Sequence, residues 1–245
     1  MMIKNMLKES AFRVGAAIWK DEGPKVLYYH DIYDRNKYYL HGTPLSLFKQ
    51  HIYLLKKLGW SVVSSIPVKP KEAMLTFDDG FHGIWDCRDF LYENNLMPTV
   101  FISVDLVGKD NYLNWDEIME LQMHGVVFES HAWSHRRLTE VPRQELEREL
   151  RDSRCLLSER LGRSINRLCF PQGRFNEEIL SLSRQYGYTE FFSCIYGNAD
   201  KHILPGLICR NLVQEVGTKV FKAILDGGAN PFWRRYYAQQ CVVSL

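Results

Sequence analysis

Two consecutive carboxylates, Asp78 and Asp79, follow a short apolar segment at residues 73–77 and precede Gly80. Successive side chains of an extended chain point to opposite sides, so these carboxylates lie near each other without sharing one task. One of them can ligate a metal ion while the other stays free to act as a base. A helix N-cap followed by a turn is the alternative interpretation, because Asp and Gly favour both.

Two histidines, His131 and His135, follow another apolar segment at residues 126–129. At a spacing of four residues, both imidazoles can lie on one face of a helical turn and bind one ion. Two imidazole nitrogens and one Asp oxygen suit zinc or a similar divalent metal. Three protein ligands leave positions open for water and substrate, which is typical of a catalytic metal site.

Strand-like and helix-like segments alternate along the chain. Strands are predicted at residues 26–29, 60–64, 73–77, 99–103, 126–129, 168–170, 189–193 and 208–213. Helices are predicted at residues 45–58, 84–93, 115–123, 143–161, 177–186 and 220–225. This alternation predicts an α/β fold with a mainly parallel sheet, and the number of units favours closure into a barrel. A doubly wound open sheet is the alternative, although no Gly-rich phosphate loop follows a strand.

Polar residues follow four of these predicted strands. In a parallel barrel, functional groups collect at the carboxyl ends of the strands. The residues at these ends are His30 and Asp31, Asp78 and Asp79, the segment 129–135, and the segment 171–173. We therefore expect them to surround one site.

Composition excludes several classes of protein. The 245 residues are 46% hydrophobic and 24% charged, as in ordinary globular proteins, so disorder and coiled coil are excluded. The formal net charge of +2 predicts no nucleic-acid partner. The six cysteines are scattered and form no CxxC pair, which favours free thiols in a reducing compartment, the cytoplasm.

The sequence predicts an amphipathic arm at residues 1–24 and a single catalytic domain at residues 25–245. The arm is a poor signal peptide, and no apolar run is long enough to span a membrane. Its apolar residues can share one face, with Lys4, Lys8 and Arg13 elsewhere. That face comprises Ile3, Met6, Leu7, Val14, Ile18 and Trp19. Two interpretations stay open: a helix packed on the domain, or peripheral contact of residues 1–20 with an anionic membrane surface.

Three ordered motifs carry a resemblance to a known family. Thr76-Phe77-Asp78-Asp79-Gly80, Ser130-His131-Ala132-Trp133-Ser134-His135 and Phe170-Pro171-Gln172-Gly173 resemble the signatures of the polysaccharide deacetylases, the NodB-homology domain of carbohydrate esterase family four. Gln172 stands where the third motif usually has Tyr. Leu27-Tyr28-Tyr29-His30 is similar to the Tyr-His start of the subgroup that deacetylates secreted poly-glucosamine polymers. The resemblance covers about residues 25–215.

This resemblance implies a distorted (β/α) barrel of NodB-homology type. It implies Asp79, His131 and His135 as metal ligands, with Zn²⁺ expected and Ni²⁺ or Co²⁺ as alternatives. It also implies Asp78 as general base, His30 as general acid and Arg210 as the group that orients the base. A backbone N–H near Gln172 is expected to hold the oxyanion. Rings expected to stack on a sugar, against the alternative of core packing, are Tyr29, Trp115, Trp133 and Phe175.

The predicted function is metal-dependent hydrolysis of the N-acetyl group of an amino sugar in a polysaccharide, an oligosaccharide or a glycan precursor. The alternatives are hydrolysis of a formamide, another amide or an ester at the same site, and a carbohydrate-binding protein without turnover. A cytoplasmic chain favours a nucleotide-linked, lipid-linked or small sugar precursor. The amphipathic arm suits a lipid-linked one.

Overall fold

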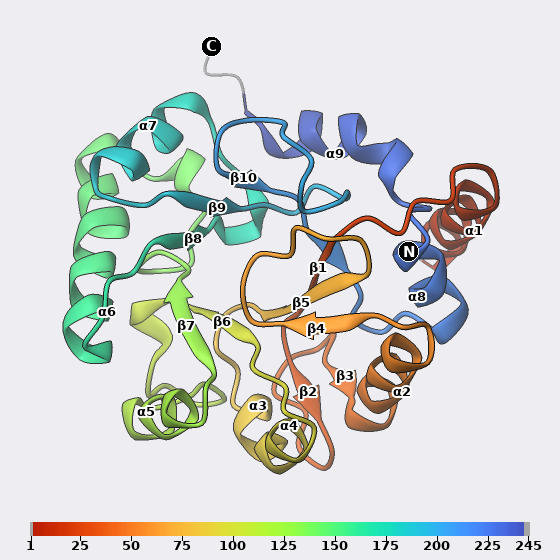
Figure 1. Ribbon diagram of the computed structural model, residues 1–245. Coiled ribbons are helices and arrows are strands. Elements are labelled where there is room, and N and C mark those ends of the chain that lie inside the picture. The colour runs from red at the N-terminus through yellow and green to blue at the C-terminus, as the bar shows by residue number, and fades with distance from the viewer. Residues whose placement is uncertain (1, 243–245) are drawn as a thin grey trace.

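The computed structural model describes the backbone of residues 2–242 and the side chains of residues 7–242, and a parallel sheet lies at its centre (Figure 1). The strands are β1 (Lys25–Tyr29), β4 (Ser61–Val63), β5 (Glu72–Phe77), β6 (Thr99–Ile102), β7 (Val127–Ser130), β8 (Arg167–Cys169), β9 (Glu190–Phe192), β10 (Leu207–Ile208) and β11 (Asn211–Leu212). The spatial order is β10-β9-β8-β7-β6-β5-β1-β11, with β4 paired to the first half of β5. Every pair among these strands is parallel, as the alternating pattern predicts.

The sheet curls into an incomplete barrel, which confirms the predicted distorted (β/α) barrel. Strands β10 and β11 lie at opposite ends of the strand order, yet only Cys209 and Arg210 separate them in sequence. Two residues span only about 7–10 Å, so the two ends of the sheet must lie close together. Arg210 therefore sits at the closure of the barrel.

Helices surround the sheet on the outside (Figure 1). They are α1 (Met2–Ile18), α2 (Leu45–Lys57), α3 (Gly83–Asp86), α4 (Arg88–Glu93), α5 (Trp115–Met123), α6 (Ser153–Leu161), α7 (Glu177–Gln185), α8 (Thr218–Leu225) and α9 (Trp233–Gln240). The predicted helix at 143–161 is broken: a 3-10 turn at Arg143–Glu145 and a π-helical segment at Arg148–Asp152 precede α6.

Alternation along the strands produces two separate cores. Val26, Met74 and Phe101 pack together inside the barrel. Leu27, Tyr29 and other alternate residues pack instead against the helices outside it. Because side chains of a strand alternate, the position of one residue inside the barrel fixes the side of all its neighbours.

A loop at residues 31–44 covers the carboxyl end of β1. Its two short strands, β2 (Ile32–Tyr33) and β3 (Thr43–Pro44), pair in parallel. The buried carboxylate of Asp31 accepts hydrogen bonds from the backbone N–H groups of Tyr38 and Tyr39, at 3.0 and 3.2 Å. Asp31 thereby fixes the part of the loop that carries these two rings.

Helix α1 packs against α8 through one face. Phe12 is buried between the rings of Tyr196 and Phe232, with ring centroids 5.2 and 5.7 Å away. Gly15 lies so close to the backbone of Gly228 that an added Cβ would come within 2.5 Å of its carbonyl oxygen. The expectation of a helix packed on the domain is thus met for α1. Within residues 2–242, none of the helices has the length and apolar character needed to cross a membrane.

Candidate active site

Polar side chains from the carboxyl ends of four strands line one cavity of about 740 Å³. His30 follows β1, Asp78 and Asp79 follow β5, His131 and His135 follow β7, and Gln172 follows β8. The remaining lining residues are Tyr28, Tyr38, Tyr39, Phe81, Tyr112, Cys194 and Gln240. The structure therefore brings together the groups that the motifs predict at four separate strand ends.

Asp79, His131 and His135 converge at the floor of this cavity. The Nε2 atoms of His131 and His135 lie 3.3 and 2.9 Å from Oδ1 of Asp79. This oxygen is buried and has no partner with hydrogen-bond geometry in the described part of the chain. One ligand atom from each of the three residues lies within 4.8 Å of the other two. A divalent cation fits this arrangement, because the two imidazoles and the carboxylate would all bind it. The buried Oδ1 atom of Asp79 would then have a partner.

The environment prepares these three residues as ligands. Nδ1 of His131 lies 2.8 Å from the carbonyl oxygen of Cys169, so Nδ1 carries the proton and Nε2 offers its lone pair. Burial works to raise the pKa of Asp79, but the two imidazoles hold that pKa well below the usual range. Burial works to lower the pKa of His135, and the contact with Asp79 outweighs it and raises that pKa. Asp79 is therefore ionised at neutral pH.

The two histidines reach the site on an irregular loop, so the expectation of a helical turn is wrong. Ala132 and His135 have φ of 65° and 61°, which interrupts any helix between the two ligands. Buried Glu149, from the π-helical segment, accepts the backbone N–H groups of Trp133 and Ser134 at 3.0 Å each. These bonds replace the missing helical ones and fix the loop.

Asp78 pairs with Arg210, although one of its carboxylate oxygens also lies within 4.8 Å of a ring nitrogen of His131. Nη1 of Arg210 donates to Oδ1 at 2.6 Å, and Nη2 donates to Oδ2 at 2.8 Å. Burial favours the neutral acid, yet the charge and hydrogen bonds of Arg210 keep the pKa of Asp78 below its usual value. Since the guanidinium binds both carboxylate oxygens, Asp78 is a poorer metal ligand than Asp79.

His30 forms another wall of the cavity. Its Nδ1 lies 2.7 Å from Oε1 of Gln214, and an amide oxygen only accepts, so Nδ1 carries the proton. The ring stacks on Tyr39 with centroids 5.0 Å apart. Nε2 is thus the ring nitrogen that remains for contact with a substrate.

Gln172 lies in a tight turn after β8, at Pro171–Gly173. Its φ of 56° is left-handed, which Gln adopts only where surrounding structure requires it. Gln172 lines the cavity, and its side-chain oxygen accepts a hydrogen bond from Nε of Arg137.

Two rings expected to contact a sugar do not line the cavity. Tyr29 is fully buried outside the barrel, where it packs on Phe48 and Phe77, so the structure does not support sugar stacking by this ring. Its neighbour Tyr28 lines the cavity instead, because successive residues of β1 alternate. Trp133 is turned away from the cavity and packs under the guanidinium of Arg148 at 4.7 Å.

The other two expected rings also serve packing. Trp115 begins α5 and lies beneath the guanidinium of Arg160 at 5.3 Å. Phe175 is fully buried and stacks on Phe170. The alternative of core packing holds for both.

Sequence reasoning missed the aromatic wall of the cavity. His30, Tyr39, Phe81 and Tyr112 stack in a continuous row, with successive centroids 5.0, 5.0 and 4.7 Å apart. Tyr39 follows β1, and Phe81 follows β5, each within ten residues. Their position shortly after a strand was the only signal in the sequence that they could line the cavity. Gln214, after β11, was missed as well, and its location after a strand was again the only clue.

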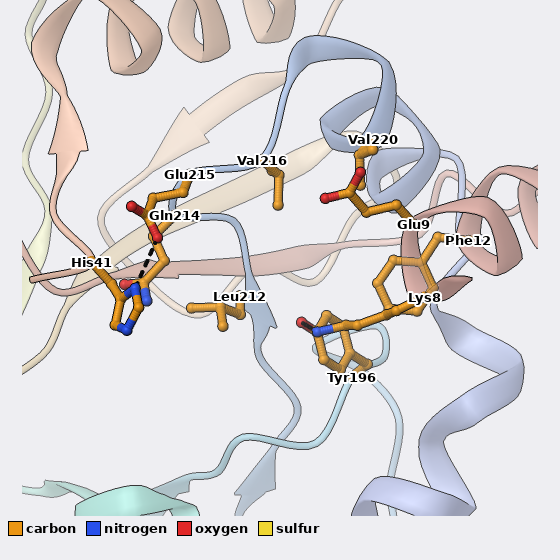
Figure 2. A pocket seen from close by; sticks show the side chains of 10 residues that line it. All are labelled: Lys8, Glu9, Phe12, His41, Tyr196, Leu212, Gln214, Glu215, Val216 and Val220. Carbon is orange, nitrogen blue, oxygen red and sulfur yellow. Dashed lines mark hydrogen bonds and ion pairs between the residues drawn. The ribbon is translucent and has the colours of Figure 1, made fainter. Parts of the chain in front are cut away.

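A second pocket of about 260 Å³ is lined by His41, Tyr196 and Gln214 among other residues (Figure 2). Gln214 lines this pocket and also bonds His30, which lines the main cavity. In Figure 2, Lys8 and Phe12 of α1 approach Tyr196 at one end of the pocket, while His41 and Glu215 pair at the other.

The fold is an incomplete parallel barrel, and its site combines an Asp-His-His cluster that could hold a metal ion with a separate Asp-Arg pair. The sequence profile of the family described as polysaccharide deacetylase matches residues 65–191, just over half of the chain. The chain therefore belongs to the polysaccharide deacetylase family. The Tyr-His subgroup stays a prediction.

Relatives and solved structures agree with this assignment. The chain is 27% identical over 174 residues to YxkH of Bacillus subtilis (strain 168), whose name includes "polysaccharide deacetylase"; the match covers 66% of this chain and 61% of YxkH. A 30.6 kDa Geobacillus stearothermophilus protein is 28% identical over 127 residues, which cover 50% of this chain and 46% of that protein. The chain thus spans less than two thirds of either relative.

Two solved structures show the same fold. The Streptococcus pyogenes deacetylase PplD in complex with acetate superposes with a TM-score of 0.72 at 19% identity, covering 83% of this chain and 98% of PplD. IcaB from Ammonifex degensii gives a TM-score of 0.72 at 18% identity, covering 86% and 98% of the two chains. At such identities the likeness establishes the fold.

Proposed function

We propose that this chain is a divalent-metal-dependent hydrolase that removes the N-acetyl group from an amino sugar of a glycan or glycan precursor. The observation that carries the proposal is that two neighbouring carboxylates have different partners. Asp79 meets two imidazoles at one oxygen, whereas Arg210 binds both oxygens of Asp78. PplD, a deacetylase described in complex with acetate, supports acetate as a product.

Asp79, His131 and His135 would hold the ion, and their mixed nitrogen and oxygen set favours Zn²⁺, with Ni²⁺ and Co²⁺ as alternatives. When bound, such an ion polarises a carbonyl and lowers the pKa of water. Asp78 accepts the proton of the water that attacks the acetamide carbon. The backbone N–H of Gln172 stabilises the oxyanion of the tetrahedral intermediate.

His30 completes the reaction as the general acid. Nε2 of the imidazolium donates its proton to the departing amine, because an amide nitrogen leaves poorly unless it is protonated. Gln214 keeps Nδ1 turned away from the substrate and so directs Nε2 toward it. Tyr112, which ends the row of stacked rings and lines the cavity, offers a ring face for the pyranose.

The test is acetate release from N-acetylglucosamine oligomers by the purified, metal-loaded chain. Asp78→Asn is expected to keep the bound metal and lose acetate release, and unchanged release would refute the assignment. Formate released from an N-formyl analogue in preference to acetate would favour the deformylase alternative. Metal and sugar binding without any turnover would favour the silent binding protein. Nucleotide-linked, lipid-linked and oligosaccharide substrates are compared in the same assay to define the carrier.

A further inference from the structure

The outward face of α1 exposes an apolar stripe. Leu7, Val14 and Ile18 are 66%, 58% and 61% exposed. At 3.6 residues per turn, these three side chains lie within about 40° of one another on the helix. Exposed apolar residues that stand singly are ordinary, whereas three aligned on one helix face mark a surface for interaction.

The helix cannot roll to bury this stripe, because its inward face is already engaged. Phe12 is buried under two aromatic rings, and Gly15 lies against the backbone of Gly228. Nζ of Lys8 donates to the hydroxyl of Tyr196 at 2.9 Å, a contact visible in Figure 2. The apolar face predicted from sequence is thus the outward one, as far as its side chains are described; those of Ile3 and Met6 lie outside the described residues.

Basic side chains flank the stripe. Arg13 of α1 lines a shallow surface pocket together with Lys219 and Lys222 of α8. Lys222 pairs with Asp226, but Arg13 and Lys219 form no ion pair within residues 7–242. Trp19, 56% exposed, and Lys20 follow the end of the helix. A stripe of apolar residues beside unpaired basic groups and an exposed Trp is complementary to the surface of an anionic bilayer.

We propose that α1 docks this chain on the surface of an anionic lipid bilayer, with Leu7, Val14 and Ile18 inserted among the lipids and Arg13 and Lys219 against their head groups. A second copy of the chain fits less well. A symmetric dimer through this face would bring the same unpaired cations together. Three side chains are also too small a surface for a stable protein interface, which buries about 800 Å² on each partner.

The test measures co-sedimentation of the full chain with vesicles of phosphatidylglycerol and phosphatidylcholine, against vesicles of phosphatidylcholine alone. We expect binding to the anionic vesicles that weakens when NaCl rises from about 0.1 M to about 1 M, because salt screens the head-group attraction. The variant Leu7→Gln/Val14→Gln/Ile18→Gln should bind at least about tenfold more weakly. Arg13→Gln/Lys219→Gln should lose the preference for anionic lipid.

A matched control carries three equally exposed apolar residues from elsewhere: Leu40→Gln/Val68→Gln/Met123→Gln, at 76%, 69% and 77% exposure. It should bind like the wild type. Quenching of Trp19 fluorescence by brominated lipid, assigned with Trp19→Phe, should accompany binding. The proposal is overturned if the stripe variant binds like the wild type, if the control loses binding equally, or if the protein is a dimer that the stripe variant dissociates. Vesicle binding is independent of turnover, so it can hold even if no deacetylation is found.

Discussion

Arg210 clamps Asp78 with both nitrogens of its guanidinium, although 132 residues separate the two in sequence. Both side chains are almost fully buried. Arg210 is placed by the closure of the barrel between β10 and β11, and Asp78 by the end of β5. The buried pair keeps one carboxylate ionised in a site that would otherwise protonate it.

Replacement of Arg210 should therefore change the pH dependence of activity. In Arg210→Gln, burial of Asp78 loses its main opposing interaction, so the pKa of Asp78 rises and the acid limb of kcat/KM moves to higher pH. Loss of one partner of a buried pair also costs about 3–5 kcal/mol of stability. Arg167→Gln, which breaks the partly exposed pair with Glu190, should leave the limb in place. An unmoved acid limb in Arg210→Gln would show that Asp78 is not the base.

The proposed metal site predicts that Zn²⁺ binds more weakly when any one of its three ligands is removed. His135→Ala should weaken Zn²⁺ binding more than about 100-fold, and Glu149→Ala, which frees the ligand loop, about 10–100-fold. Competition with a chromogenic chelator measures both. His82→Gln removes a histidine that pairs with Glu117 outside the triad and should bind Zn²⁺ normally. Affinity should fall as the pH falls through the pKa of His135, since protons then compete with the ion.

The role of His30 predicts a dependence on the leaving group. His30→Ala should lower kcat for an N-acetyl amine about 10²–10⁴-fold, with metal content unchanged. For an aryl acetate the loss should be small, because a phenolate leaves without prior protonation. Gln214→Ala should reproduce part of the amide-specific loss. His202→Ala, in an exposed loop, serves as the control. Equal losses on amide and ester would argue against general-acid catalysis by His30.

The shifted pKa values of Asp31 and His51 predict opposite effects of pH on the free energy of unfolding. Burial raises the pKa of Asp31 to about 6, despite backbone hydrogen bonds from Tyr38 and Tyr39. The folded state therefore binds this proton more tightly than the unfolded state, and stability gained from Asp31 is present at low pH and lost as the pH rises through 6. Burial lowers the pKa of His51 to about 4, so its contribution is lost as the pH falls from about 6.5 toward 4.

Asp31→Asn should consequently stabilise the chain above pH 6, by up to about 3 kcal/mol, and lose that advantage by about pH 4. Because the opposing contribution of Asp31 is removed, the stability of the variant should fall more steeply on acidification than that of the wild type. Urea unfolding between about pH 4 and pH 7 measures both slopes. Parallel slopes in the two proteins would contradict the high pKa of Asp31.

The packing of α1 predicts that Gly15 is indispensable for its attachment. Gly15→Ala places a methyl group 2.5 Å from the carbonyl oxygen of Gly228, so α1 must shift. Such overpacking costs about 1–3 kcal/mol, or about 2–4 °C in Tm for each kcal/mol in a chain of this size. Ser10→Ala, on the exposed face, should cause no loss. An unchanged Tm in Gly15→Ala would mean that residues 1–24 behave as an arm separate from the domain at 25–245.

Local sequence was sufficient for the parallel barrel, for the strand ends that line the cavity and for the meeting of Asp79, His131 and His135 in one cluster. Asp78, Asp79, His131 and His135 follow apolar strands directly, and parallel strands bring their carboxyl ends to one edge whatever the connecting helices do. The tertiary structure decided which rings meet the cavity, because the register of β1 turns Tyr28 inward and Tyr29 outward. It also decided that a kinked loop tied to Glu149 presents the histidines, that Gln214 orients His30, and that α1 buries Phe12 and leaves Leu7, Val14 and Ile18 outside. These contacts join residues far apart in the chain, and periodicity within one segment contains no information about what another segment will cover.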